Sequence, residues 1–594
     1  MRQRARHLTA SLATVSALAL LVTGAPAHAD PRAVAKSPTA VGTGGAVATV
    51  DADATRVGLD VLRKGGNAVD AAVAAAATLG VTEPFSAGIG GGGFFVYYDA
   101  TSGQVHTIDG RETAPQAMGP DSFGTLSFND AVTSGLSVGV PGTPKTWQTA
   151  LDRWGTLSLS KALQGGRHVA NRGFVVDATF RQQTAANQDR FNDFTSTRDL
   201  YLPGGQPPAV GTVFKNPDLA DTYERLGTEG VGWLYNGSLA GEIVNTVKHP
   251  PVASDANRDP KPGLMETSDL AAYTAPLRKP TVIDYRGLTV YGMAPPSSGG
   301  STVGEALNIL DNVNLGAMTR TQALHNYFEA SALAYADRNA YLGDPSAMTV
   351  SLDELLSQGF ADERFCKVDP AHAMSKPTAA GNPDGSYADC DGADDSTTAA
   401  DREGHSTTHL TVADKWGNVV SYTLTIESTG GNAMVVPGRG FLLNNELTDF
   451  NFPNAAGQPN APGPGKRPRS SMSPTIVLDD GVPFLALGSP GGSTIITTVL
   501  QTLINRLDLG MTLPQAIAEP RANQRNTVTA TVQFEPAFDP AQKAALTALG
   551  HVFASTPTPD IGAATAIEFL PGGRLLAAAE PVRRGGGSAG VVAP

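Results

Sequence analysis

The residues best suited to chemistry lie in the segment TTHLTVADKWGNVVSYTLTIE, residues 407–427, where hydroxyl and apolar side chains alternate. Such alternation is typical of strands, and the central DKWGN is typical of a hairpin turn. If the hairpin is symmetric about Trp416, Thr407 lies opposite Thr425, with Cβ atoms about 4.5–5.5 Å apart and the hydroxyls within hydrogen-bonding reach. The plainer alternative is a ladder of threonines on an exposed sheet face, which is common.

A threonine hydroxyl is a poor nucleophile unless a base stands beside it. Cleavage of the bond between Ser406 and Thr407, where a polar linker meets the predicted strand, would release an α-amine with an ordinary pKa of about 8. One cut would therefore create nucleophile and base on the same residue, and Thr425 could orient the hydroxyl as the third member of a triad does.

Other polar groups could bind or stabilise a substrate. Gly491 and Gly492 follow an apolar strand and precede a predicted helix, so their N–H groups could point at a developing oxyanion, although a plain tight turn explains the motif equally well. Some charged and hydroxyl residues are individually more often caps or surface ion pairs than ligands. These are Arg111, Glu446, Asp449, Ser470 and Ser471.

The glycines of GIGGGGFF offer a second motif, because Gly88, Gly90 and Gly93 spell G-x-G-x-x-G. A dinucleotide-binding turn follows a strand and opens a helix, whereas this motif follows a predicted helix and leads into a strand. We therefore expect close backbone packing beside a pocket and no dinucleotide.

Two further motifs are weak. Ser158 and Lys161 spell S-x-x-K, but neither S-D-N nor K-T-G follows, so we interpret the match as chance. His405 and His409 lie on predicted extended chain, where their spacing gives no shared helical face, and His409 is expected to be structural. We expect no metal site and no organic cofactor.

Composition limits the class of protein. The chain has 594 residues, 17% charged residues and a net charge of -13, so nucleic acid and anionic lipid are disfavoured as partners and a small-molecule substrate is preferred. Residues 1–29 have an arginine-bearing start, a short apolar run and small residues before Asp30, as in a secretory signal peptide. No later stretch is long and apolar enough to span a membrane. The mature protein is therefore expected to be secreted.

The order of predicted elements indicates one large body of α/β or α+β type. Helices and strands alternate up to FFVYYD and QVHTIDG, residues 160–348 are mostly helical in pattern, and β character dominates after residue 406. Residues 369–406, rich in Asp, Gly, Ser and Thr, are predicted to be a surface linker and the main internal boundary. The only two cysteines, Cys366 and Cys390, are candidates for one disulfide across part of this region, with two free thiols as the alternative.

Taken together, these motifs resemble the γ-glutamyltranspeptidase family, also called glutathione hydrolases. The resemblance covers nearly all of the mature chain, and the motifs occur in order: GGAVAT, GGNAVDAAVA, TEPFSAGIGGGGF, DGRETAP, PPSSGG, YADRNAYLGDP, TTHLTVADKWGNVVSYTLTIE, GRGFLLNNELTDF, KRPRSSMSPTIV and GSPGGSTIITTVLQ. It implies an N-terminal nucleophile hydrolase fold, an αββα sandwich of two stacked antiparallel sheets flanked by helices. It also implies a precursor that cuts itself into a large subunit, residues 30–406, and a small subunit, residues 407–594, which remain together as a heterodimer.

The resemblance also implies roles for individual residues. Thr407 is the nucleophile, Thr425 orients it, and Gly491 and Gly492 form the oxyanion hole. The α-carboxylate of a γ-glutamyl substrate such as glutathione is implied to bind Arg111, Ser470 and Ser471. The acids implied to surround its α-amino group are Glu427, Glu446 and Asp449.

Two segments depart from the family pattern. Residues 430–433 read GGNA where many members have an aromatic residue followed by G-S/T-G, and residues 449–470 are short and resemble those of members without a lid loop. The second departure predicts an open site that accepts bulky γ-glutamyl substrates. A cephalosporin acylase and an unprocessed, inactive binding protein are the alternative functions.

Overall fold

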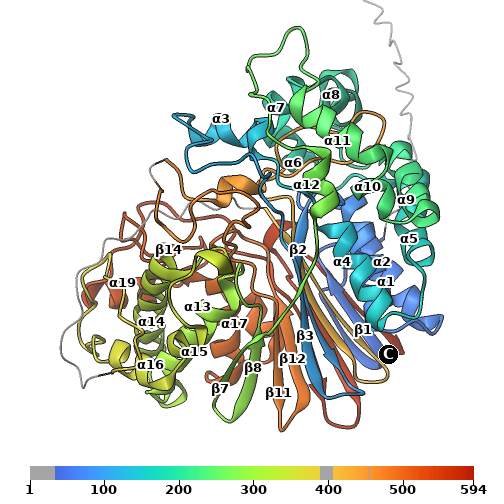
Figure 1. The fold of residues 1–594 in the computed structure, drawn as a ribbon. Coiled ribbons are helices and arrows are strands. Elements are labelled where there is room, and N and C mark those ends of the chain that lie inside the picture. The colour runs from blue at the N-terminus through green and yellow to red at the C-terminus, as the bar shows by residue number, and fades with distance from the viewer. Residues whose placement is uncertain (1–31, 33, 388–405, 454, 594) are drawn as a thin grey trace, which may run out of the picture.

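Two antiparallel sheets lie face to face between layers of helices in the computed structural model, which describes residues 32, 34–387, 406–453 and 455–593 (Figure 1). The first sheet contains strands from both ends of the chain. In spatial order these are β6 (Leu277–Arg278), β3 (Gln104–Gly110), β2 (Gly92–Asp99), β10 (Val419–Thr425), β9 (Thr408–Asp414), β1 (Thr39–Thr49) and β17 (Ser588–Ala593).

The second sheet is joined to the first through β1, whose residues 39–42 pair with β16 while its later residues pair with β9 and β17. Its order is β1, β16 (Arg574–Ala579), β15 (Thr565–Leu570), β12 (Val482–Gly488), β11 (Thr475–Asp479), β8 (Leu288–Gly292) and β7 (Thr281–Tyr285). Two short pairs lie apart, β4 (Phe174–Val175) with β5 (Val213–Phe214), and β13 (Ala522–Asn523) with β14 (Gln533–Phe534).

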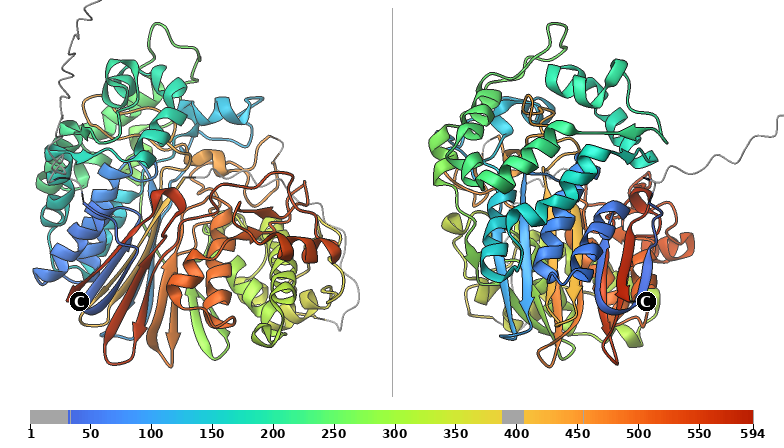
Figure 2. Two further views of the ribbon diagram at one scale, coloured as in Figure 1. Left: turned by 180° about the vertical axis from the view of Figure 1, so that it is seen from behind. Right: turned by 90° about the vertical axis from the view of Figure 1, so that its right-hand side faces the viewer.

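Helices cover the outer face of each sheet, as the turned views show (Figure 2). Those on the first sheet are α1 (Ala52–Arg63), α2 (Ala68–Thr82), α4 (Thr143–Trp154) and α5 (Leu159–Arg172), the last packing on α2. Those on the second are α13 (Gly299–Asp311), α17 (Thr494–Leu507) and α18 (Leu513–Ala518), with α14 (Arg320–Tyr341) packed on α13. The predicted αββα sandwich is therefore confirmed.

The remaining helices are short or lie outside the layers, and α6 to α12 gather at one end of the molecule (Figure 1, green). They are α3 (Phe128–Val132), α6 (Ala178–Ala186), α7 (Gln188–Asn192), α8 (Thr195–Tyr201), α9 (Pro217–Glu229), α10 (Gly232–Tyr235), α11 (Ser238–Lys248), α12 (Thr267–Ala272), α15 (Leu352–Leu355), α16 (Gln358–Phe365) and α19 (Pro540–Ala548). The 3-10 turns are η1 (Gly135–Ser137), η2 (Pro203–Gly205), η3 (Leu315–Ala317), η4 (Pro345–Ala347), η5 (Glu446–Asp449) and η6 (Arg583–Gly585).

The hairpin of β9 and β10 lies at the centre of this sandwich. Its outer face packs on α2, all of whose residues are buried, and its inner face meets β12 and β15 of the other sheet. Every residue of both strands is buried, so the alternative of an exposed threonine ladder is wrong. The register pairs Thr408 with Leu424 and His409 with Thr423, which is the predicted symmetry about Trp416.

Of two predictions about the middle of the chain, one is confirmed and one needs correction. Residues 160–348 are mostly helical, as predicted, and they also contribute the short strands β4 to β8, of which β8 pairs with β11 and β7 with β8 at the edge of the second sheet. The predicted surface linker is anchored over its first part: the Lys376 side chain is 6% exposed, Ala380 is buried, and Gly381 N donates to Asp337 Oδ1 at 2.6 Å. Polar composition suggested exposure, but these groups bond to the body of the protein.

Several predictions fall on residues outside the described ranges. The signal peptide at residues 1–29, Cys390 and His405 all lie there, so the signal peptide and the Cys366–Cys390 bridge stay predictions. Among the helices that the structure describes, none is long and apolar enough to cross a membrane.

Candidate active site

The Ser406–Thr407 peptide lies at the entry to β9, with both residues buried. Thr407 Oγ1 lies 3.2 Å from Thr425 Oγ1, so the hydroxyl pair predicted from hairpin symmetry is confirmed. The same Thr407 hydroxyl contacts the carbonyl oxygen of Ser406 at the peptide bond predicted to be cut. Thr425 Oγ1 lies 3.4 Å from that carbonyl oxygen, so both hydroxyls converge on one carbonyl group.

Thr425 is held in this position by the turn that follows β10. The backbone N–H of Glu427 donates to Thr425 Oγ1 at 2.8 Å, leaving the threonine proton free to point toward Ser406. Glu427 has a φ of 75°, in the left-handed region that side chains with a Cβ rarely adopt, at a cost of about 1–3 kcal/mol. Its side chain accepts from Ser428 Oγ and from Asn445 Nδ2, which fix the carboxylate beside the cleft.

A narrow cleft opens at this hydroxyl pair, and the structure brings almost all of the predicted site residues to its wall. The lining residues are Arg111, Ser406, Thr407, Thr425, Glu427, Glu446, Asp449, Ser470, Ser471, Met472, Gly492 and Ile495. Of the predicted set, Gly491 alone is not on the wall. The cleft holds only about 10 Å³, room for about one water, so the open site predicted from the short 449–470 segment is not seen in the uncut chain.

Arg111 and two acids form a buried ion cluster on this wall. The guanidinium contacts Glu446 through Nη1 and Asp449 through Nη2, and it donates to Pro468 O at 3.1 Å. Burial opposes the charge of Arg111, but the two carboxylates more than compensate and raise its pKa above the usual value. For Glu446, burial also opposes the charged form and therefore raises the pKa well above normal, although Arg111 acts in the other direction. Arg111, predicted to bind the α-carboxylate of the substrate, is therefore paired with Glu446 and Asp449, the acids predicted to bind its α-amino group.

The two serines are held by motifs to which the sequence alone gave no role. Ser298 of the PPSSGG motif donates through its N–H and its hydroxyl to Ser470 O, both at 2.7 Å. Arg338 of the YADRNAY motif donates to Ser471 Oγ and to Ser298 Oγ, both at 2.8 Å. The sequence did contain a signal for this hydrogen-bond network, because Ser298 and Arg338 lie in two of the motifs that resemble the family.

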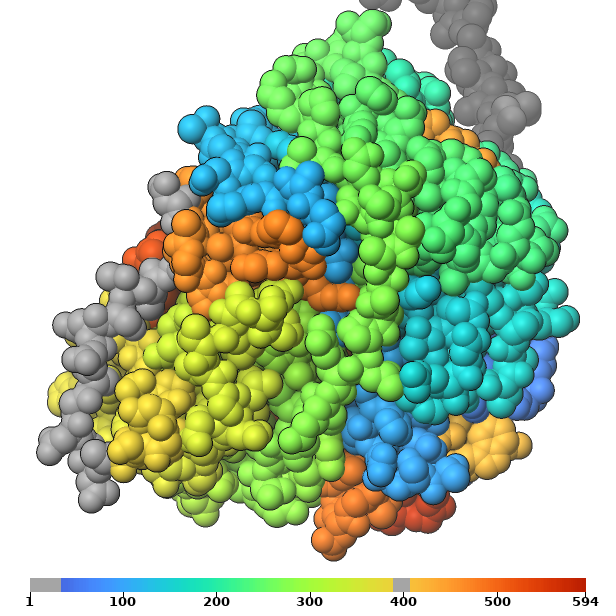
Figure 3. All heavy atoms as spheres, in the orientation of Figure 1, coloured from blue at the N-terminus to red at the C-terminus, as the bar shows by residue number. Residues whose placement is uncertain are grey.

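The segment from Asp449 to Ser471 is enclosed by parts of the chain that are distant in sequence. In the space-filling view, its orange atoms lie between the blue region near residue 120 and the yellow-green region around α14 (Figure 3). Phe450 and Phe452 share an apolar cluster with Met118 and Phe123, and Arg469 Nη1 donates to Arg338 O at 3.3 Å.

The turn between β12 and α17 has the geometry expected of an anion site. Gly491 and Gly492 have φ of 138° and 56°, and their N–H groups donate to no acceptor within the described residues. A side chain at Gly491 would meet Thr494 Oγ1 at 2.6 Å, so glycine is required there. Two unpaired N–H groups beside the cleft can stabilise a developing oxyanion.

Glu112 is a buried carboxyl behind the cleft that sequence reasoning missed. It follows Arg111, its side chain lies against Gly92 and Gly139, and its hydrogen-bonding neighbour among the described residues is the carboxyl of Glu446. Burial raises the pKa of Glu112 to about 8. A proton shared between the Glu112 and Glu446 carboxyls fits this pair, because two adjacent buried carboxyls do not both ionise readily. The quoted DGRETAP motif contains it, but its charge state depends on burial, which the motif does not reveal.

The weaker motifs have structural roles. Side chains at Gly90 and Gly93 would clash with the backbone oxygens of Leu442 and Thr423, which confirms the predicted close backbone packing. Ser158 caps α5. His409 bonds to Thr423 Oγ1 at 2.8 Å and to Thr411 Oγ1 at 3.2 Å, and burial lowers its pKa to about 3, so it is a neutral structural residue.

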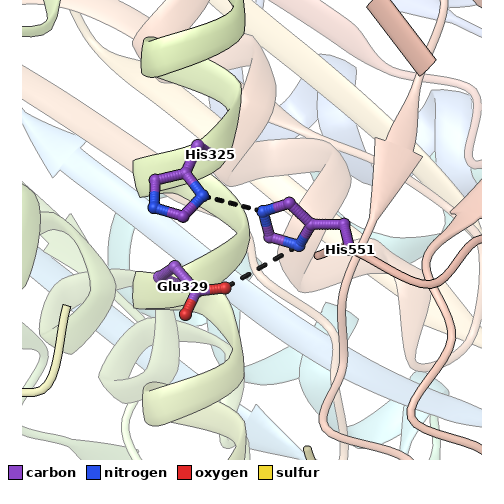
Figure 4. Close-up of side chains that lie close together, drawn as sticks. All are labelled: His325, Glu329 and His551. Carbon is purple, nitrogen blue, oxygen red and sulfur yellow. Dashed lines mark hydrogen bonds and ion pairs between the residues drawn. The ribbon is translucent and has the colours of Figure 1, made fainter. Parts of the chain in front are cut away.

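A separate cluster of His325, Glu329 and His551 has the residue types of a metal site (Figure 4). His325 Nδ1 lies 2.9 Å from His551 Nε2, and His551 Nδ1 lies 3.8 Å from Glu329 Oε1. Lys376 already pairs with Glu329 Oε1, and Met374 N donates to Oε2 at 2.9 Å. Because the carboxylate holds an ammonium, we interpret the cluster as a structural tie that joins α14 to the segment after α16 and to the loop after α19.

The sandwich and the strand-initial threonine beside a possible oxyanion hole define the class: the fold is that of the N-terminal nucleophile hydrolases. A sequence model described as gamma-glutamyltranspeptidase matches residues 54–590. The chain belongs to the γ-glutamyltranspeptidase family and is by class an enzyme of γ-glutamyl transfer or hydrolysis.

The relatives with known names include both glutathione hydrolases and acylases. The chain is 38% identical over 557 residues to a glutathione hydrolase proenzyme of Bacillus subtilis (strain 168), covering 91% of this chain and 92% of the relative. It is 34% identical over 552 residues to the acylase ACY 1 proenzyme of Pseudomonas sp. (strain V22), with the same coverage. The structure of a cephalosporin acylase from Bacillus halodurans superimposes with a TM-score of 0.81 at 28% identity, over 95% of this chain and 99% of that one.

Proposed function

We propose that the chain is an inactive precursor that cuts itself between Ser406 and Thr407 and then hydrolyses or transfers the γ-glutamyl group of glutathione and related compounds. The observation that carries the proposal is the contact of the Thr407 hydroxyl with the Ser406 carbonyl oxygen at the end of a polar cleft. Thr407 Oγ1 also lies 3.2 Å from Thr425 Oγ1. The products are a large subunit, residues 30–406, and a small subunit, residues 407–594.

The cut follows from this geometry. Thr407 Oγ1 attacks the carbonyl carbon of Ser406, the peptide C–N bond breaks, and the nitrogen takes the hydroxyl proton, which leaves an ester between the two residues. Water then adds across the ester, giving a carboxyl group on Ser406 and a free amine and hydroxyl on Thr407. Thr425, 3.4 Å from the carbonyl oxygen, can donate to the negative charge that develops there.

The freed Thr407 then acts on substrate. Its hydroxyl attacks the γ-amide carbonyl, its α-amine takes the proton and passes it to the leaving amine, and a γ-glutamyl ester forms on Oγ1. Water or an acceptor amine resolves this ester. Thr425 orients the hydroxyl, while Gly491 and Gly492 supply N–H groups to the oxyanion.

The charged wall suits an α-amino acid head group. Arg111, Ser470 and Ser471 can bind a carboxylate, whereas Glu427, Glu446 and Asp449 can bind an ammonium. Because Arg111 is paired with Glu446 and Asp449 in the uncut chain, substrate exchanges ion pairs already formed in a buried site. We further propose that residues 1–29 direct secretion and are removed.

N-terminal sequencing of the smaller band tests the proposal, and TTHLTVAD is the expected start. Thr407→Ala should leave one uncut chain without turnover of γ-glutamyl-p-nitroanilide. A fragment with another start would overturn the assignment of Thr407, and an exported wild-type chain that stays whole would favour the inactive binding protein.

A cephalosporin acylase is the second candidate, favoured by the superposition on such an enzyme. A glutaryl side chain carries a carboxylate but no ammonium, so it would leave the acids of the cleft without a partner. Comparison of kcat/KM on γ-glutamyl-p-nitroanilide and on a glutaryl cephalosporin separates the two. We expect the γ-glutamyl substrate to be preferred by at least about tenfold, the effect of about 1.4 kcal/mol.

A further inference from the structure

The cleavage junction is also held from the side away from the cleft. Ser406 Oγ lies 2.8 Å from Ser86 Oγ and donates to Phe85 O at 2.9 Å. Arg584 donates through Nη1 to Thr407 O at 2.6 Å and through Nη2 to Ser86 Oγ at 2.8 Å. One guanidinium therefore ties together both residues of the peptide bond that is proposed to break.

Arg584 occupies an unusual backbone position. It has a φ of 54° within η6, in the left-handed region, and its carbonyl oxygen accepts from Thr179 Oγ1 at 3.0 Å. A conformation that costs about 1–3 kcal/mol persists only where the surroundings determine it. The contacts of the guanidinium are therefore part of what fixes this loop against the junction.

Glu83 is the acid that faces this guanidinium. It caps the C-terminus of α2, is 8% exposed, and lies with Oε2 3.4 Å from Arg584 Nη2. Its other oxygen, Oε1, accepts from no donor in the described residues, and the side chain lines a cavity of about 440 Å³. The cavity reaches the surface beside the exposed Asp177, so protons can reach Glu83 without passing the cleft.

The charges around Glu83 set when it ionises. Burial raises its pKa to about 7, opposed by Arg584 and by Lys36, and supported by Asp177 and Asp51. Lys36 is shared, since its Nζ donates to Gly586 O at 2.9 Å and lies 3.4 Å from Asp177. Glu83 is therefore neutral in mildly acidic solution and charged in mildly alkaline solution, where it attracts Arg584.

We propose that Glu83 is a positioning residue for self-cleavage: its carboxylate holds the Arg584 guanidinium, which fixes the Ser406–Thr407 peptide for attack by the Thr407 hydroxyl. The role rests on the proposed function, because it requires the cut before Thr407. Fixing Thr407 O and the Ser406 side chain restricts rotation on both sides of the reacting carbonyl. Misplacement of a reacting group by about 1 Å can slow a reaction by about 10²-fold.

The test follows conversion of freshly synthesised precursor, made in a cell-free system, into its two fragments from pH 5.5 to pH 9. The wild-type rate constant should rise through about pH 7 as Glu83 ionises. Glu83→Gln should lose that rise and cleave at least about tenfold more slowly at pH 8, with an unchanged melting temperature. Glu83→Asp, which keeps the charge on a shorter arm, should retain the inflection in the pH profile.

Asp177→Asn is the matched control, because Asp177 lines the same cavity but pairs with Lys36 instead of Arg584. It should keep the inflection and the wild-type rate constant at pH 8, with the inflection moved to lower pH because Asp177 no longer raises the pKa of Glu83. If Glu83→Gln keeps the wild-type rate and pH profile, or if Asp177→Asn loses the inflection equally, the role of Glu83 is overturned. If wild-type precursor is not cut before Thr407, the proposed function itself fails, and N-terminal sequencing distinguishes that outcome.

Discussion

At the scale of residues, the site depends on a hydroxyl that has two functions. Thr425 Oγ1 accepts from Glu427 N and lies within reach of both the Thr407 hydroxyl and the Ser406 carbonyl. A side chain that only filled space would need no hydrogen bonds, whereas Thr425 Oγ1 has three hydrogen-bonding neighbours. Thr425 is therefore the residue whose chemistry can be separated most cleanly from its shape.

Replacing Thr425 with Val keeps the shape and removes the hydroxyl. We expect kcat on γ-glutamyl-p-nitroanilide to fall by about 10²-fold with KM little changed, because the hydroxyl orients the nucleophile and does not bind the head group. Thr425→Ser is the control and should retain most activity. Only cleaved enzyme can be compared, so band intensities on a gel accompany the kinetics. A Thr425→Val enzyme with wild-type kcat would contradict the orienting role.

At the scale of elements, the segment from Asp369 to Gly381 is fastened to α14 by a polar tie. His325 Nε2 lies 2.8 Å from Asp369 O, and Glu329 binds both Lys376 and the backbone of Met374. Thr378 N also donates to Asn526 Oδ1 at 2.7 Å. The segment from Asp369 to Gly381 is thereby bound to the part of the chain that follows Thr407.

Breaking this tie on one side should be costly, because Lys376 would stay buried without a counter-ion. Glu329→Gln is expected to lower the free energy of unfolding by about 3–5 kcal/mol. The double variant Glu329→Leu, Lys376→Met removes both charges and should recover most of that loss. Urea unfolding of uncut Thr407→Ala protein measures both, and equal losses in the single and double variants would show that the ion pair is not the cause.

The elements also show how far sequence reasoning reaches. The register of β9 and β10 was predictable because a tight turn fixes strand pairing locally, and α17 was predictable from apolar periodicity. The tie at Lys376 was not, since the polar composition of the segment favours exposure and its partners lie far along the chain. The same holds at the site: Arg584 is 177 residues from Thr407 and 498 from Ser86, so no local pattern links them.

At the scale of the whole molecule, the two parts separated by the Ser406–Thr407 bond alternate in blocks of strands through both sheets. In the first sheet β2 pairs with β10, and β1 lies between β9 and β17. In the second sheet β8 pairs with β11 and β1 pairs with β16. In both sheets, strands from before Ser406 therefore pair with strands from after it.

Cutting the chain before Thr407 should consequently leave the particle intact. Separation would break the ladders of β1 with β9, β16 and β17 and expose the buried residues of β9 and β10, whose burial stabilises the assembly by about 25 cal/mol per Å² of apolar surface. We expect two bands on a denaturing gel but one peak in size-exclusion chromatography, at the same volume as uncut Thr407→Ala. Two native peaks would mean that strand pairing does not hold the fragments together. Because the fragments share sheets and not a surface, we also expect them to dissociate only in the urea range in which the uncut chain unfolds.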